Sequence, residues 1–180
     1  QHGIQMRERT AREMPTPFTS SLMRGCVERG RDLLTGMDYH RPGLYERQIA
    51  NGANALAAIE QLVFDQKALR LSELIDALKA DFQGTNLRER IARAPKWAAG
   101  DERADRWALR LIEMRERVLD DLDAEFGQGP HMVCHVVRSL HYVDGRRIAA
   151  SPDGRLAGTP VADSIGAQQN TARAGPTGAL

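Results

Sequence analysis

The sequence is poor in cysteine, has no excess of either charge and contains no long apolar run. Its only cysteines, Cys26 and Cys134, are too few for a disulfide framework, so a reducing, cytoplasmic compartment is expected. Basic residues number 25 and acidic residues 24, a formal net charge of +1 that excludes the electrostatic footprint of a dedicated nucleic-acid binder. Because no stretch of about 18 apolar residues occurs, no segment of this sequence is expected to span a membrane.

Lysine is also scarce, since Lys67, Lys79 and Lys96 are the only lysines among the 25 basic residues. We attribute this arginine bias to codon composition and not to function. Hydrophobic residues make up 42% and charged residues 27% of the sequence, which disfavours the collagen-like, disordered and coiled-coil classes. A chain of 180 residues suits one domain, or one piece of a larger domain.

Both ends of the sequence suggest a piece of a longer protein. Residues 1–5 contain no initiator methionine and no secretion-signal pattern, so either a leader was removed or the chain begins inside a protein. Residues 175–180 stop where a turn gives way to small and apolar residues. We therefore expect truncation at both ends.

Glycine and proline divide the sequence into a helical region, 15–126, and a strand and loop region, 127–180. Residues 1–126 and residues 127–180 each hold 8 Gly and 4 Pro, although the second stretch is far shorter. Apolar spacing and capping residues predict helices in the first region. The predicted helices are Thr16–Glu28, Asn51–Gln66, Glu73–Phe82 and Arg103–Phe126. The first is expected to end at Gly30 and the second to be largely buried. The third has Ser72 as its expected N-cap and Gly84 as its expected terminator.

The last of these helices is amphipathic. Its charged residues 120–125 are expected to form a solvated face and not a metal site. The opposite, apolar stripe consists of Trp107, Leu111, Met114, Val118, Leu122 and Phe126.

The region after residue 126 has a different pattern. The β-branched residues of Met132–Val137 predict a strand. Asp144-Gly145 is a strong hairpin signal, and it leads toward a short second strand near Ile148. The fold class expected from the residues is therefore α/β, a helix-rich segment with a β-hairpin and a structured loop.

Four side chains suggest a zinc site, because imidazole and thiolate are preferred zinc ligands. They are His131, Cys134, His135 and His141. On a strand, however, His131 and His135 are about 13 Å apart at about 3.3 Å per residue, and Cys134 points to the opposite face. We therefore expect no metal site here.

Cys26 and Glu28 place a thiol two residues from a carboxylate, a pairing that could serve radical or acid/base chemistry. On a helix, positions i and i+2 project in different directions. Cys26 is therefore predicted to be a small buried hydrophobe, and the two residues stay as the weakest kind of catalytic candidate.

The segment Ser151–Arg155 predicts a rigid turn. Pro152 sets the first corner, Asp153 bonds its own backbone and Gly154 tolerates a positive φ. Arg155 is then held in place, either to bind a carboxylate or to brace the loop running to Asp163, and we favour the brace. The glycine spacing in this segment does not match that of a phosphate-binding loop. Without a resemblance to a known family, the residues reveal no function.

Several segments together resemble the glycyl radical enzymes, the superfamily of pyruvate formate-lyase and glycerol dehydratase. The most specific resemblance is to the family's (Ala/Thr)-x-Pro-Asp-Gly-Arg, Gly-x-Pro-(Leu/Val)-(Ala/Ser)-Asp and Asn-Gly-Pro-Thr blocks. The matching residues are 16–18, 25–32, 49–64, 71–84, Ala94-Pro95-Lys96-Trp97 with Asp105, Ser151-Pro152-Asp153-Gly154-Arg155, 158–164 including Asp163, and Gly175-Pro176-Thr177.

The resemblance implies that residues 1–180 are part of a ten-stranded β/α barrel domain, truncated at both ends. In such enzymes a radical S-adenosylmethionine activase takes a hydrogen atom from a glycine, and a cysteine thiyl radical then attacks a small organic substrate. The implied parent is a homodimeric lyase or dehydratase with no bound cofactor. Its reaction class stays open among C–C, C–N or C–S lysis, dehydration, decarboxylation and addition to fumarate.

The family's radical glycine lies in an Arg-Val-x-Gly-Tyr-type motif, which this sequence does not contain. Cys26 is followed by Arg29-Gly30-Arg31-Asp32, which matches a later family helix better than the catalytic cysteine loop. The segment by itself is therefore expected to be inactive and to contribute barrel wall. The alternative is a stand-alone helical interaction module that resembles the enzyme by descent.

Overall fold

A computed structural model describes residues 2–39, 43–126, 130–135, 139–173 and 175. The chain forms two compact units, residues 1–44 with 117–133 and residues 45–116 with 134–180. Among the described residues, no helix combines the length and the apolar character needed to cross a membrane.

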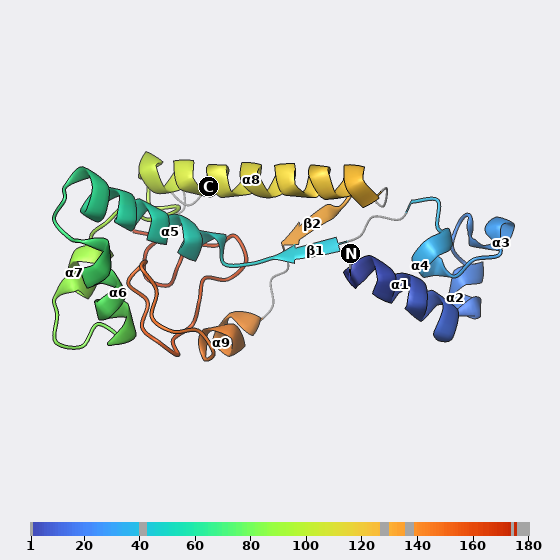
Figure 1. Ribbon diagram of the computed structural model, residues 1–180, viewed down its shortest axis with the longest axis horizontal. Helices are drawn as coiled ribbons and strands as arrows, with labels where there is room; N and C mark the ends of the chain where they lie inside the picture. Colours follow the sequence, from blue (N-terminus) through green and yellow to red (C-terminus); the bar gives the residue numbers. More distant parts are fainter. Residues whose placement is uncertain (1, 40–42, 127–129, 136–138, 174, 176–180) are drawn as a thin grey trace. The chain divides into compact units, whose positions relative to one another are not determined.

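The N-terminal unit, which also includes residues 117–133, contains the helices shown in blue in Figure 1: α1 (His2–Glu13), α2 (Pro17–Ser21), α3 (Cys26–Arg29) and α4 (Leu33–Gly36). α4 packs against each of the other three. The predicted helix Thr16–Glu28 is therefore wrong as one element, because it is broken between α2 and α3. Gly25, at the break, has φ +90°, a conformation that a helix interior does not allow. The predicted end at Gly30 is confirmed, since this residue is the left-handed C-cap of α3.

Asp32 organises the N-terminal unit. Its carboxylate accepts hydrogen bonds from the backbone N–H of Leu34 at 3.0 Å and of Thr16 at 2.7 Å, and from the hydroxyls of Thr16 and Ser20. These bonds, that from Leu34 foremost, lower the pKa of Asp32 to about 2. One side chain thus caps α4 and ties it to the start of α2.

The larger unit is built on α5 (Ile49–Ile59), which continues into a π-helical turn, η1 (Glu60–Asp65). α6 (Leu71–Lys79) and α7 (Leu87–Ala92) follow, shown in green in Figure 1. The burial predicted for the helix 51–66 is confirmed for α5, whose alanine-rich face is covered, but Phe64 near the end of η1 is 64% exposed. The core cluster consists of Ala58, Leu62, Leu69, Leu74, Ala77, Phe82, Leu87, Ile91 and Ala94.

The start of α6 differs from the prediction. The helix begins at Leu71, and Ser72 is an exposed residue of its first turn, so the predicted Ser72 cap is wrong. The backbone N–H of Arg70 donates instead to the carboxylate of Glu73 at 2.8 Å, which stabilises the helix start. The regular helix ends at Lys79, and Phe82, with φ +59°, is buried in the turn that follows.

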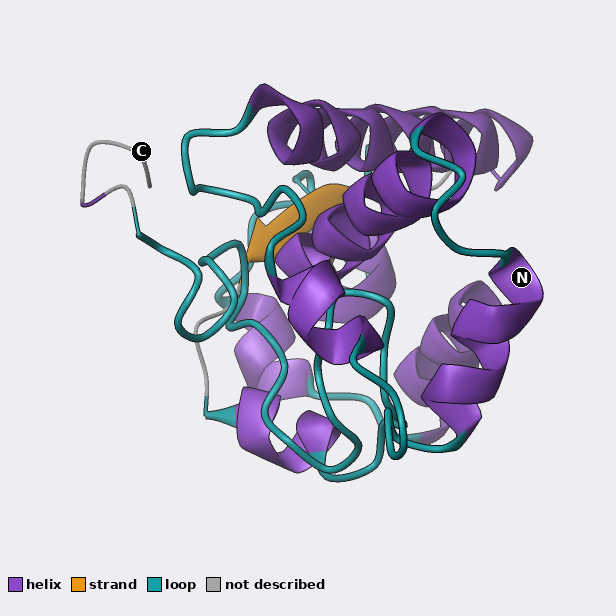
Figure 2. Ribbon diagram, turned by 90° about the vertical axis from the view of Figure 1, so that its left-hand side faces the viewer, coloured by secondary structure: helices purple, strands orange, loops and turns teal. Residues whose placement is uncertain are grey.

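The long helix predicted at Arg103–Phe126 is confirmed as α8 (Glu102–Phe126). Its predicted apolar stripe is only partly right, since Met114 is 58% and Val118 53% exposed. Ala104 and Ala108 are fully buried instead. α5 and the first part of α8 lie side by side in Figures 1 and 2, and both helices have fully buried alanines, Ala53 and Ala57 in α5 and Ala104 and Ala108 in α8.

The sheet is not the predicted hairpin. β1 (Gly43–Glu46) and β2 (Met132–His135) form a two-stranded parallel sheet, shown in orange in Figure 2. The predicted turn at 143–146 lies mostly within a short helix, α9 (Leu140–Gly145), so the hairpin prediction is wrong. The end of the predicted strand, residues 136–137, lies outside the described residues.

Candidate functional site

The turn Ser151–Arg155 is closed by an antiparallel bridge between its two ends. Asp153, only 2% exposed, accepts hydrogen bonds from the Ser151 hydroxyl at 2.5 Å and from the Arg155 backbone N–H at 3.3 Å. Gly154 has φ +91°, which a residue with a side chain rarely adopts. The turn is thus stabilised by its own polar groups.

The Arg155 guanidinium is buried and donates in several directions. Nη1 donates to the carbonyl oxygens of Leu156 and Thr159, each at 2.9 Å. Nη2 donates to the carbonyls of Ile148 and Ala149, and Nε donates to the Ser151 hydroxyl at 3.2 Å. The guanidinium therefore lies among backbone oxygens of residues 148–159.

Asp163 does not meet Arg155 in the described contacts. One carboxylate oxygen of Asp163 lies 3.8 Å from Nδ1 of His141. Of the last family block, Gly175 is exposed with φ +73°, and Pro176 lies outside the described residues.

Two asparagines of α5 join this helix to distant segments of the unit, Asn51 to the turn and Asn54 to Trp97 and Gln168, and sequence reasoning missed both. Asn51 donates to the Asp153 carboxylate and accepts from the Ala162 backbone N–H at 2.7 Å. Asn54, fully buried, accepts from the Trp97 backbone N–H at 2.6 Å and donates to Gln168. The sequence feature that could have pointed to them is the presence of amide side chains on the buried face of an alanine-rich helix, because a buried polar group needs a hydrogen-bond partner.

Lys96 is buried beside the same network. Its ammonium donates to the Ile91 carbonyl at 2.7 Å. Burial lowers the pKa of Lys96 to about 8, although the nearby Asp153 carboxylate opposes that shift. Lys96, Asp153 and Arg155 are thus buried polar groups, of which Lys96 binds a backbone oxygen of α7 and the other two bind within the loop that contains the turn.

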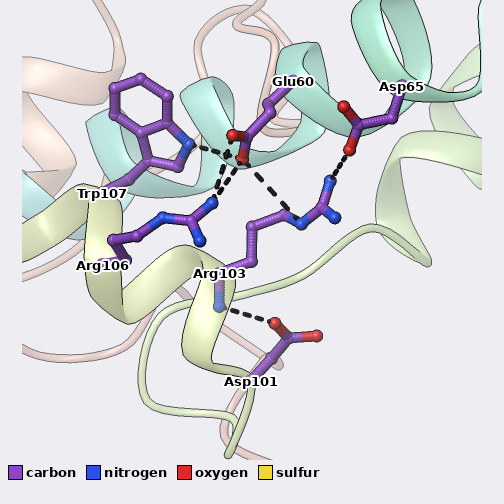
Figure 3. A network of polar contacts seen from close by, with 6 residues as sticks. All are labelled: Glu60, Asp65, Asp101, Arg103, Arg106 and Trp107. Carbon is purple, nitrogen blue, oxygen red and sulfur yellow. Dashed lines mark hydrogen bonds and ion pairs between the residues drawn. The ribbon is translucent and has the colours of Figure 1, made fainter.

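A second polar network joins η1 to the beginning of α8 (Figure 3). Glu60 accepts from Nε1 of Trp107 at 2.9 Å and from Nη2 of Arg106 at 3.2 Å. Arg103 pairs with Asp65, at 2.5 Å, and its backbone N–H donates to Asp101. Because Glu60 and Asp65 each meet an arginine and the groups are partly exposed, this network adds modest stability.

A third cluster lies where the two strands end. Glu46, the last residue of β1, pairs with Nη1 of Arg115 from α8. Nε2 of His135, the last residue of β2, lies 3.8 Å from the same Glu46 oxygen. Nε of Arg115 is buried with no hydrogen-bond partner among the described residues. Sequence reasoning favoured a sheet-packing role for His135 over a metal-ligand role and did not consider Glu46 or Arg115.

The four side chains of the zinc interpretation have separate surroundings. His131 binds Asp123 through its ring and through its backbone N–H, the latter at 2.8 Å. His135 lies near Glu46, and His141 near Asp163. Cys134 is a free, partly buried thiol. Within the described part of the chain, no group of His, Cys, Asp and Glu residues is arranged to hold a metal ion.

Cys26, at the start of α3, is 2% exposed, whereas Glu28 is exposed. The thiol lines a cavity of about 360 Å³ together with Pro15, Pro17 and Asp32. Burial, followed by the charge of Asp32, raises the pKa of Cys26. A buried, protonated thiol is a poor nucleophile, so the site does not suit covalent chemistry.

Alkylation tests this view of Cys26. At pH 8 the native chain is expected to react with iodoacetamide at Cys26 at least ~10-fold more slowly than free cysteine, because little thiolate is present and access is restricted. The measurement is mass spectrometry of tryptic peptides over time, with the Cys134→Ser variant removing the other thiol. Labelling as fast as that of free cysteine would support the catalytic interpretation instead.

Known proteins resemble this chain in sequence. The sequence model described as pyruvate formate lyase-like matches residues 5–138. Isethionate sulfite-lyase of Oleidesulfovibrio alaskensis is 31% identical over 181 residues, covering 94% of this chain and 21% of that protein. Trans-4-hydroxy-L-proline dehydratase of Clostridioides difficile is 27% identical over 173 residues, covering 94% and 22%.

Solved structures of dehydratases also resemble this chain. The glycerol-bound form of the B12-independent glycerol dehydratase from Clostridium butyricum superposes with a TM-score of 0.86 at 26% identity, covering 96% of this chain and 22% of that one. A structure concerning 1,2-propanediol dehydration in Roseburia inulinivorans gives a TM-score of 0.84 at 29% identity, covering 96% and 23%.

The chain is a helix-rich α/β fragment with a two-stranded parallel sheet, and it matches parts of the structures of glycyl radical enzymes. The chain belongs to the pyruvate formate lyase-like family. It spans about a fifth of the length of the curated relatives it matches.

Proposed function

We propose that the chain is part of the barrel domain of a glycyl radical lyase or dehydratase that acts on a small hydroxylated molecule. The observation that carries this proposal is similarity along almost the whole chain, 94%, to a sulfite-lyase of isethionate and to a dehydratase of trans-4-hydroxy-L-proline. The structure with bound glycerol, at a TM-score of 0.86, adds a third hydroxylated compound. The alternative, a non-catalytic helical module, is not favoured by these relatives.

A glycyl radical supplies hydrogen-atom chemistry to such an enzyme, and a radical S-adenosylmethionine activase is the proposed partner that installs it. The residues of this chain do not fit the radical carriers. Cys26 is buried with a raised pKa, and the sequence lacks the Arg-Val-x-Gly-Tyr-type motif. What these residues do is position the wall of the barrel.

The positioning role rests on the larger unit. Asn51 joins α5 to the Ser151–Arg155 turn and to Ala162, so two distant segments are held by one side chain. The parallel pair of β1 and β2 is the kind of unit from which a β/α barrel wall is made. We further propose a ten-stranded barrel, a homodimer and a cytoplasmic location, the last because the two cysteines are free.

Radical installation tests the proposed function. The full-length protein, incubated without oxygen with its activase and S-adenosylmethionine, is expected to give the electron paramagnetic resonance doublet of a glycyl radical. The 180-residue chain under the same conditions is expected to give none, because it lacks the motif. A doublet from the short chain would contradict the assignment of the radical to another segment.

The flanking DNA provides an independent check. An open reading frame that continues through both ends, beside a gene for a radical S-adenosylmethionine enzyme, is the expected finding. In-frame stops on both sides would instead support the stand-alone module.

A further inference from the structure

We propose that His135 contacts a hydroxyl group of the substrate, and that Glu46 and Arg115 are positioning residues that hold its imidazole. This inference rests on the proposed function and adds a named contact to it. Glu46 and His135 are the last residues of β1 and β2. In parallel α/β folds, ligands bind at the carboxyl ends of the strands, where both residues lie.

The contacts place the three side chains in order, from the interior outward. Arg115 is 14% exposed and pairs with Oε2 of Glu46, which is 19% exposed. The same Glu46 oxygen faces Nε2 of His135, whose side chain is 32% exposed. A ligand can therefore reach the imidazole more easily than the carboxylate or the guanidinium behind it.

The imidazole of His135 can still form a hydrogen bond with a ligand. A separation of 3.8 Å between His135 and Glu46 is an electrostatic contact and longer than a hydrogen bond. Such contacts tighten when a substrate binds. With Nε2–H directed at the carboxylate, Nδ1 is left as an acceptor, and a hydroxyl group is the donor that suits it.

His131 provides a contrast at the other end of the same strand. It immediately precedes β2, and both its ring and its backbone N–H are bonded to Asp123. The side chains of His131 and Asp123 are 20% and 18% exposed, so this pair is closed and more covered than the pair at His135. In barrels the amino ends of strands serve stability, which matches this difference.

The test uses the activated full-length enzyme and four variants, with glycerol, 1,2-propanediol, isethionate and trans-4-hydroxy-L-proline as probes. His135→Gln and His135→Asn are expected to raise KM for the converted probe ~10-fold or more, since a ligand hydrogen bond is lost. Glu46→Gln is expected to raise KM by a smaller factor. The spin count of the glycyl radical should match wild type in each. His131→Gln is the matched control, expected to lower thermal stability and leave KM unchanged.

The outcomes are distinguishable. A wild-type enzyme with neither radical nor turnover would overturn the proposed function, and the inference with it. An active wild type whose His135 variants keep both radical content and KM would overturn the inference alone. Loss of radical content and thermal stability in both His135 variants would assign this residue to packing, and would also overturn it.

Discussion

Replacing Arg155 with lysine is expected to lower the free energy of unfolding of the full-length enzyme by about 3 kcal/mol. Arg155 is 4% exposed, and its planar fork donates to four backbone carbonyls and one hydroxyl. A lysine ammonium has three donors at one point and cannot reach oxygens on both sides of the loop. Carbonyls left buried without a partner then destabilise the native state.

A denaturant melt of the full-length enzyme, combined with steady-state kinetics, measures this effect. Arg88→Lys is the matched control, because its Nε makes an exposed bond to the Gly154 carbonyl at 3.2 Å and its loss should change little. An unchanged midpoint for Arg155→Lys together with a steep rise in KM would assign Arg155 to substrate binding.

Gly145→Ala is expected to destabilise the chain by about 3 kcal/mol, because α9 packs directly against the following loop. A Cβ at Gly145 would lie 2.2 Å from the carbonyl oxygen of Thr159 and 2.8 Å from Cα of Pro160. Both are backbone atoms, so the clash cannot be relieved by rotating a side chain. The loop from 156 to 161, which Arg155 also binds, would have to move.

Gly52→Ala, in the middle of α5, is the control for this substitution. The nearest atom to its added Cβ is Cδ1 of Leu111 at 3.2 Å, which belongs to a flexible side chain. Because alanine favours a helix over glycine, this variant should range from neutral to about 1 kcal/mol more stable. Urea unfolding of both variants, followed by circular dichroism, compares them; equal midpoints would contradict the packing argument.

Local patterns in the sequence determined a large part of the helical structure. The 3.6-residue period and the flanking glycines predicted α8 almost to the residue, and also the buried character of α5. The turn chemistry of Pro152, Asp153 and Gly154 produces the observed self-bonded turn. The motif order along the chain was also sufficient for the family, which the comparisons confirm. All of these signals act over a few neighbouring residues, or depend on residue order alone.

Tertiary structure alone decided the sheet, the burial of polar groups and the composition of the candidate site. Asp144-Gly145 favours a hairpin locally, yet packing of Gly145 against Thr159 and Pro160 places it in α9. β2 pairs with β1, which is remote in sequence and has no turn signal linking the two. Glu46, Arg115 and His135 meet only through that pairing and the position of α8. Such contacts depend on which distant surfaces exclude water from each other, and no local pattern records that choice.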